Sequence, residues 1–117
     1  MVDDDQAVRE TIGEILTDAG YECLLASDGW TALALFGEKA PDIPLVILDW
    51  AMDGLDGAET FRQLRRIDPG VRAILMSGYQ RSLEVEGLVA EGIKAYIPKP
   101  FQIEDVVRIV HSVLGDR

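Results

Sequence analysis

The chain has 117 residues, enough for one domain with a buried core. Apolar residues make up 48% and charged residues 27%, a balance that is typical of globular proteins and excludes an intrinsically disordered chain. The formal net charge of −10 argues against direct binding to nucleic acid, because phosphate groups are bound by basic surfaces. No apolar run approaches the roughly 18 residues of a membrane span and no signal peptide opens the chain, so we expect a cytoplasmic domain without membrane contact.

The first strand of the chain is short. Met1 and Val2 are the only apolar residues ahead of the acidic run Asp3, Asp4 and Asp5. Buried strands usually run to about five residues. We therefore expect a truncated first strand, in a chain that was cut from a longer one or whose numbering omits disordered residues.

The next segments alternate between helical and extended patterns. Apolar residues recur at helical spacing from Val8 until Gly20, which is a natural C-terminal stop. Residues 21–26 predict a second strand, although Glu22 interrupts its apolar pattern. Residues 27–29 offer a helix cap. The helix that follows carries its apolar face on Ala32, Leu33 and Phe36.

Residues 46–49 (Val-Ile-Leu-Asp) predict the central strand. A short apolar run bounded by turn residues is typical of a strand buried on both faces of a parallel sheet. Asp49 is the first polar residue at its carboxyl end, which is the edge where open α/β sheets bind ligands. A carboxylate in that position is costly unless something there uses its charge.

The second half of the chain repeats the alternation. Asp56 and Glu59 form a capping box for a helix that ends at Asp68, and residues 71–76 predict a fourth strand. Residues 82–91 form the poorest predicted helix, because a glycine near its middle costs roughly 1 kcal/mol relative to alanine. A fifth strand over residues 93–98 and an amphipathic helix over 103–114 complete the chain.

Five alternations of strand and helix with short connections predict one domain over residues 1–117. Right-handed crossovers then give an α/β fold, a doubly wound parallel sheet with helices on both faces. We expect the flavodoxin-like arrangement of five strands in the order 2-1-3-4-5, with five helices.

Polar groups follow four of the five predicted strands at their shared carboxyl edge. They are the acidic run 3–5, Asp49, Ser77 and Lys99. Each alone has an ordinary explanation: the acidic run as a helix cap, Asp49 and Ser77 as turn residues, and Lys99 as a solvated strand end. Their common edge favours a site.

Clustered carboxylates keep their charges only when a cation joins them. An oxygen-only shell suits Mg²⁺ better than zinc, and Cys23 and His111 are the only residues of their types, so no zinc cluster is available. Asp49 can then act as a nucleophile toward a phosphoryl group. The metal would neutralise one phosphoryl oxygen and Lys99 another, and the Ser77 hydroxyl can hydrogen-bond the third.

With these motifs in place, the sequence resembles the receiver domain of two-component response regulators over essentially its whole length. The matching stretches are residues 2–5, 46–57, 74–79 and 96–101. The resemblance implies that Asp49 is the phosphoacceptor, and that Mg²⁺ is held by Asp3, Asp4, Asp49 and the Ala51 carbonyl.

The resemblance also implies a switch. Ser77 is similar to the hydroxyl that moves toward the phosphoryl group, Tyr96 to the aromatic side chain that turns inward on activation, and Lys99 to the phosphate-pairing lysine, with a cis bond to Pro100. Asp53 and Tyr79 depart from the common pattern of the family and bear on the lifetime of the phosphoryl group.

The implied function is a phosphorylation-activated signalling switch that changes the surface of its last two helices. It catalyses only its own phosphorylation and dephosphorylation. His111 lies near the end of the last helix and is a poor donor, so the phosphoryl group would come from a partner histidine kinase or histidine phosphotransfer domain. The output would be a downstream protein target or an attached output domain. The SGY turn after the fourth strand resembles receivers of hybrid sensor histidine kinases, and homodimer formation stays open.

Two other functions compete with this interpretation. A Mg²⁺-dependent aspartyl phosphohydrolase would need a second acid two residues after the nucleophile, where this chain has Ala51. A degenerate receiver that acts only as an interaction or dimerisation module would not need Asp3, Asp4, Asp49, Ser77 and Lys99.

Overall fold

The computed structural model describes residues 1–39, 42–52, 54–78 and 83–115, with the side chains of residues 83–86 left aside. Asp53, Tyr79 and Ser82 lie outside this part of the chain. The helices and strands, in chain order, are α1 (Gln6–Asp18), α2 (Gly29–Lys39), β1 (Val46–Asp49), α3 (Gly57–Ile67), β2 (Ala73–Ser77), α4 (Leu83–Glu91), β3 (Ala95–Pro98) and α5 (Ile103–Gly115).

The three strands form a parallel sheet in the order β1-β2-β3. Leu48 lies opposite Leu75, and Leu75 lies opposite Tyr96, so the strands are paired without a bulge at these positions. These strands correspond to the third, fourth and fifth strands expected from the sequence, and their order agrees with that expectation.

On the side of β1 that faces away from β2, the described residues pair only through single bridges. Val2 makes one parallel bridge to Ala26 and one to Leu48. The strand expected over residues 21–26 is therefore wrong for residues 21–25, which have no strand conformation. The physical reason is that a strand needs a partner along its whole length. Here the neighbouring segment consists of little more than Met1, Val2 and Asp3. The complete five-strand order stays a prediction.

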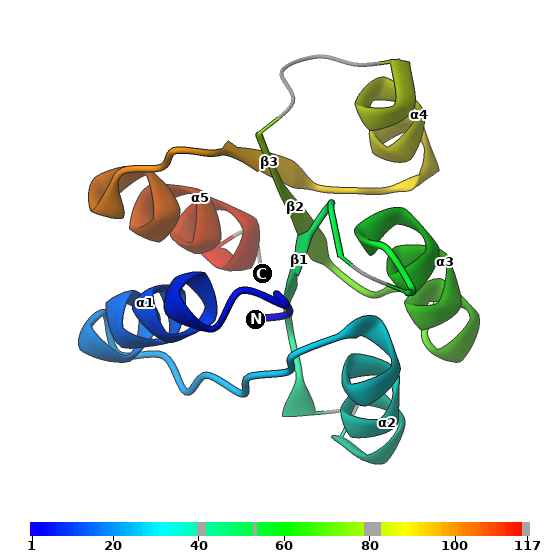
Figure 1. Ribbon diagram of the computed structural model, residues 1–117, viewed down its shortest axis with the longest axis horizontal. Helices are drawn as coiled ribbons and strands as arrows, with labels where there is room; N and C mark the ends of the chain where they lie inside the picture. The colour runs from blue at the N-terminus through cyan, green and yellow to red at the C-terminus, as the bar shows by residue number, and fades with distance from the viewer. Residues whose placement is uncertain (40–41, 53, 79–82, 116–117) are drawn as a thin grey trace.

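Helices cover both faces of the sheet, α1 and α5 on one side and α2, α3 and α4 on the other (Figure 1). Alternate strand residues point to opposite faces, so Ile47 and Ile74 pack with the first pair of helices, whereas Leu48 and Leu75 pack with the second group. All four residues of β1 are buried, as expected for a strand covered on both sides. None of the described helices combines the length and apolar content required to cross a bilayer.

Aspartates begin three of the helices. The side chain of Asp5 accepts hydrogen bonds from the backbone at the start of α1, Asp28 from Thr31, and Asp56 from Glu59. The capping box expected at α3 is only half formed, because the Glu59 carboxylate accepts from Gln63. Asp56 also accepts through its carbonyl oxygen from the Thr60 hydroxyl, at 2.7 Å.

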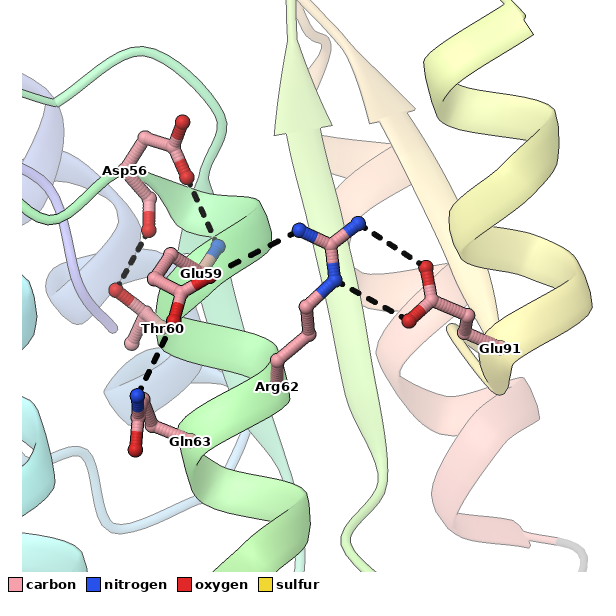
Figure 2. A network of polar contacts seen from close by, with 6 residues as sticks. All are labelled: Asp56, Glu59, Thr60, Arg62, Gln63 and Glu91. Carbon is pink, nitrogen blue, oxygen red and sulfur yellow. Dashed lines mark hydrogen bonds and ion pairs between the residues drawn. The ribbon is translucent and has the colours of Figure 1, made fainter.

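An ion pair joins α3 to α4. Figure 2 shows the Arg62 guanidinium between Glu59, on its own helix, and Glu91, the last residue of α4. Arg62 donates from Nε and Nη2 to the two carboxylate oxygens of Glu91, each at 3.2 Å, and Nη1 lies 3.8 Å from Glu59. The carboxyl end of α4 is thus tied to α3, and Leu88 is buried one turn earlier.

The backbone at the amino terminus lies inside the fold. The Met1 ammonium group donates to the Leu24 carbonyl oxygen at 2.8 Å, and burial lowers its pKa below the usual 8.0. A cavity of about 1040 Å³ opens beside it, lined by Tyr21, Leu45 and other mainly apolar residues. Cys23 is partly buried at this cavity.

Candidate functional site

The register of the sheet brings the predicted site residues to one edge. Asp49 is the last residue of β1 and Ser77 is the last residue of β2. Ser77 lies opposite Pro98, and the next residue, Lys99, donates its backbone N–H to the Ser77 carbonyl oxygen at 2.9 Å. The side chains of Asp49, Ser77 and Lys99 therefore start from neighbouring strand ends.

The acidic run reaches the same edge through Val2. The backbone N–H of Val2 donates to the Ile47 carbonyl oxygen at 2.8 Å, and its own carbonyl oxygen accepts from Asp49 at 2.9 Å. Asp3, the next residue, donates to the Ala26 carbonyl oxygen at 3.2 Å. These three bonds set Asp3 beside Asp49 even though no continuous strand supports it.

One ammonium group bridges two carboxylates at the centre of the site. The Lys99 Nζ atom lies 2.8 Å from Oδ1 of Asp49 and 3.3 Å from Oδ2 of Asp3. The side chain of Asp3 is fully buried, that of Asp49 is 6% exposed and that of Lys99 is 27% exposed. Asp3 and Asp49, from two neighbouring segments, therefore meet Lys99, which follows β3, as the sequence predicted.

The three consecutive aspartates have different surroundings. Asp3 turns into the site, and its Oδ1 atom accepts from the backbone N–H of Asp5 at 2.9 Å. Asp4 is exposed at the rim of the site. Asp5 points away and caps α1 by accepting from Ala7 and Val8. The cap and the site thus share the run, so the ordinary explanation considered for the whole run holds for Asp5 alone.

The electrostatics of the site favour binding of a further cation. Burial raises the pKa of Asp49, and the negative charges of Asp3 and Asp4 raise it further against the opposing effect of Lys99. Burial works to lower the pKa of Lys99, but its hydrogen bond to Asp49 and the charges of Asp49 and Asp3 outweigh burial, so the pKa is raised. Three carboxylates lie near one lysine ammonium group, so the acidic groups outnumber the lysine at this site.

The donor set fits Mg²⁺. One carboxylate oxygen from each of Asp3, Asp4 and Asp49 lies within 4.8 Å of the others. Hard oxygen ligands with room for water are what Mg²⁺ prefers, and two of the three carboxylates are buried and therefore in need of a counter-charge. Ala51 lies two residues beyond β1 and is exposed; its carbonyl as a ligand stays a prediction.

The expected switch residues are linked to each other. Ser77 is buried, and the half-buried Tyr96 donates its phenolic hydroxyl to the Ser77 carbonyl oxygen at 3.1 Å. The Tyr96 ring packs against the core on the side of α2, α3 and α4. The Lys99–Pro100 bond is cis, as the family resemblance implies.

Two residues that support the site were not expected. The Arg9 guanidinium donates to the Asp3 carbonyl oxygen at 2.9 Å, and a basic residue one turn into a helix gives no signal of that contact. Gly57 begins α3 so close to β1 that a Cβ atom there would overlap the Asp49 carbonyl oxygen. The sequence gives no signal of this close approach at Gly57.

Known proteins resemble this chain over nearly all of its length. The family model described as the response regulator receiver domain matches residues 1–111. The chain is 39% identical over 115 residues to the response regulator MprA of Mycobacterium sp. (strain KMS), and 38% identical over 114 residues to that of Mycobacterium leprae (strain TN). These alignments cover 97% of this chain and 49% of each relative, so the chain spans about half the length of the curated relatives it matches.

Solved structures give the same picture. The chain superimposes on one chain of the CheX–CheY–BeF3–Mg complex from Borrelia burgdorferi with a TM-score of 0.92 and 28% identity. The match covers 97% of this chain and 85% of the chain in that complex. For the receiver domain of NtrX from Brucella abortus, the TM-score is 0.91 and the identity 27%, covering 99% and 97% of the two chains.

Proposed function

This chain belongs to the family of response regulator receiver domains, and on that premise we propose that it is a switch operated by phosphorylation of Asp49. The observation that carries the proposal is the position of Lys99, whose Nζ atom lies 2.8 Å from the Asp49 carboxylate and 3.3 Å from Asp3. A nucleophilic carboxylate, a neighbouring acid for the metal and a cation for the incoming charge are what aspartyl phosphorylation requires.

The proposed reaction is a phosphoryl transfer onto a carboxylate oxygen of Asp49. That oxygen attacks the phosphorus, the new P–O bond forms, and the bond from phosphorus to the donor histidine nitrogen breaks with the electron pair left on nitrogen. Asp3, Asp4 and Asp49, with the Ala51 carbonyl, would hold Mg²⁺, which supplies charge neutralisation for the phosphoryl oxygens when bound.

Lys99 would exchange partners during the transfer. It starts on the Asp49 oxygen and, as that oxygen becomes part of the phosphoryl linkage, the ammonium can pair with a phosphoryl oxygen. Asp3, at 3.3 Å, keeps it at the site during the exchange. The domain would catalyse only its own phosphorylation and dephosphorylation.

The conformational response would run through Ser77 and Tyr96. A phosphoryl group adds about −1.5 to −2 charge near neutral pH, which would draw the Ser77 hydroxyl toward it. Because Tyr96 is bonded to the Ser77 carbonyl oxygen, movement at the end of β2 reaches β3 directly. The surface of α4 and α5 would then change; the Arg62–Glu91 ion pair joins the carboxyl end of α4 to α3.

The proposed partners follow from the family. A histidine kinase or histidine phosphotransfer domain would supply the phosphoryl group to this domain in the cytoplasm, and the chain could be part of a hybrid sensor kinase. A downstream protein, an attached output domain or a second copy of the chain would respond. The similar structure from Borrelia burgdorferi is a complex that contains BeF3, Mg and the protein CheX. It supports the proposal that this chain binds a phosphoryl group with Mg²⁺ and a protein partner.

Phosphorylation is tested by incubation with acetyl phosphate and Mg²⁺, followed by intact-protein mass spectrometry. We expect one added phosphoryl group, absent from Asp49→Ala and retained in Asp18→Asn, which changes an exposed aspartate at the far end of α1. Steady release of phosphate would instead indicate a phosphohydrolase, and the absence of any adduct would indicate a degenerate receiver.

The switch is tested separately by comparing amide NMR spectra with and without beryllofluoride and Mg²⁺. We expect shifts at Ser77, Tyr96 and along α4. Shifts confined to the immediate surroundings of Asp49 would contradict the switch while leaving phosphorylation intact.

A further inference from the structure

A small basic hollow lies at the opposite edge of the sheet from Asp49. Arg72 and Lys94 stand directly before β2 and β3, and Arg108 and Ser112 come from α5. The hollow has a volume of about 330 Å³, and its remaining lining residues are Ala95, Ile109 and Val113. It shares no residue with the acidic site.

The charge of this hollow runs against that of the chain as a whole. The chain has 21 acidic and 11 basic residues, yet three of the basic residues line the hollow and none of its seven lining residues is acidic. A concave site lined by one sign of charge concentrates ions of the opposite sign. The general surface of this protein repels anions, so this hollow is a local exception.

Arg72 gives the second, independent observation. Its Nη1 atom is buried and has no hydrogen-bond partner within the described part of the chain. A buried donor without an acceptor is costly, and more so when it carries charge. Arg72 also lines the hollow, so an anion bound there would compensate the charge of its guanidinium group.

The other basic groups are available to join Arg72. Arg108 contacts Asp105 on its own helix at 3.0 Å, but both side chains are exposed, 69% and 42%, and exposed pairs of this kind contribute little. Lys94 is exposed and can turn its ammonium group toward the hollow, and the Ser112 hydroxyl can donate from α5.

We propose that this hollow binds a small, multiply charged oxyanion of the phosphate class, either inorganic phosphate or the phosphate of a monoester. Guanidinium groups bind phosphate with two parallel hydrogen bonds, and lysine adds a point charge. The volume lies at the lower end of the range for small-molecule sites, which suits one such group. The inference does not depend on phosphorylation of Asp49.

The test is an NMR titration of the ¹⁵N-labelled chain with inorganic phosphate in the absence of Mg²⁺. Phosphate would be raised to about 20 mM, above the millimolar dissociation constants that correspond to weak binding. The ionic strength is held constant because salt screens exposed charges. We expect saturable shifts of the Arg72 and Arg108 Nε–H signals and of the amides at Lys94 and Ser112, and none at Asp49.

Matched variants identify the groups responsible. Arg72→Gln and Lys94→Gln should each weaken phosphate binding by about tenfold, the effect expected for loss of one charged hydrogen-bond donor. Arg66→Gln, which removes an exposed arginine from α3 outside the hollow, should leave binding unchanged. Lys94 is exposed, so its variant tests the site even if a change at Arg72 disturbs folding.

Two further ligands test whether the hollow accepts a phosphate monoester and whether it prefers phosphate to a carboxylate anion. Phenyl phosphate should bind if the hollow accepts a monoester, and phosphate alone should bind if it accepts only the free ion; either result supports the proposal. Citrate should bind more weakly than phosphate. The proposal would be overturned if citrate bound more tightly than phosphate, or if Arg66→Gln weakened phosphate binding as much as Arg72→Gln does. It would also be overturned if the shifts grew linearly with phosphate and did not saturate.

Discussion

β1, β2 and β3 are paired over four positions at each junction, whereas Val2 joins its two neighbours through a single bridge on each side. The reactive half of the site, Asp49, Ser77 and Lys99, is held by the extended pairing. Asp3 and Asp4 depend on Val2 and on local bonds such as the one from Arg9 to the Asp3 carbonyl oxygen. The comparison indicates that Asp49 and Lys99 are fixed by the sheet, while Asp3 and Asp4, the proposed metal ligands, are placed by a few separate contacts.

The largest effect is expected from Gly57→Ala, which strikes the better-supported half. The new Cβ would overlap the Asp49 carbonyl oxygen, and neither backbone segment can move freely, so the free energy of unfolding should fall by about 1–3 kcal/mol. Phosphorylation by acetyl phosphate should slow as α3 is displaced from the site.

The matched control is Gly37→Ala in α2, where a Cβ meets nothing within 4 Å. It should raise the free energy of unfolding by up to about 1 kcal/mol through helix propensity. Urea unfolding measures both variants, and equal changes in the two would contradict a close approach at Gly57.

The second prediction concerns the weaker half. Val2→Ala leaves the backbone bonds of Val2 in place but removes most of the buried side chain that anchors this segment, so Mg²⁺ affinity should fall, on the order of tenfold. Val71→Ala removes the same atoms from an equally buried valine ahead of β2 and should leave that affinity nearly unchanged. Fluorescence of Trp50, the residue after Asp49, can follow Mg²⁺ binding; a similar loss of affinity in both variants would remove the distinction.

The third prediction concerns the 117-residue polypeptide with a free amino group at Met1. Because the pKa of that group is lowered in the folded protein, the unfolded chain binds more protons than the folded one between the lowered pKa and 8.0. The free energy of unfolding should therefore rise with pH across this window and level off above it. Urea unfolding at a series of pH values measures the rise, and acetylation of the terminus should flatten it. A profile that stays the same after acetylation would place its origin elsewhere.

The smallest effect is expected at the α3–α4 ion pair. Its hydrogen bond to Arg62 lowers the pKa of Glu91, so the stabilisation is present above the unfolded pKa of the carboxyl group and is lost as pH falls through the lowered value. Glu91→Gln should lower the urea midpoint slightly at neutral pH and not at all in acid. Glu38→Gln, at an exposed position of α2, should cause no such pH-dependent difference.

Sequence patterns predicted the strands and the site where the cause is local or follows from parallel topology. Asp49 and Lys99 could be placed together because parallel strands share one edge. The strand at 21–25 failed because pairing depends on a neighbour, which the local pattern does not contain. The close approach at Gly57 is a distance between backbones, and spacing gives no measure of it.

The basic hollow escaped prediction for a related reason. Arg72, Lys94 and Arg108 stand far apart in the chain and come together only when α5 packs across the starts of β2 and β3. Each one alone resembles an ordinary surface residue.

The run Asp3-Asp4-Asp5 has a consequence for helix α1. The Asp5 backbone donates to the carboxylate of Asp3, the proposed metal ligand, and the Asp5 side chain accepts from the amides of Ala7 and Val8, so Asp5 connects Asp3 to the first turn of α1. By thermodynamic linkage, an ion that binds Asp3 and stabilises the first turn of α1 is itself bound more tightly when that turn is ordered, by the same free energy. Hydrogen exchange at Ala7 and Val8 should then slow when the ion is present, making two amides outside the site reporters of its occupancy.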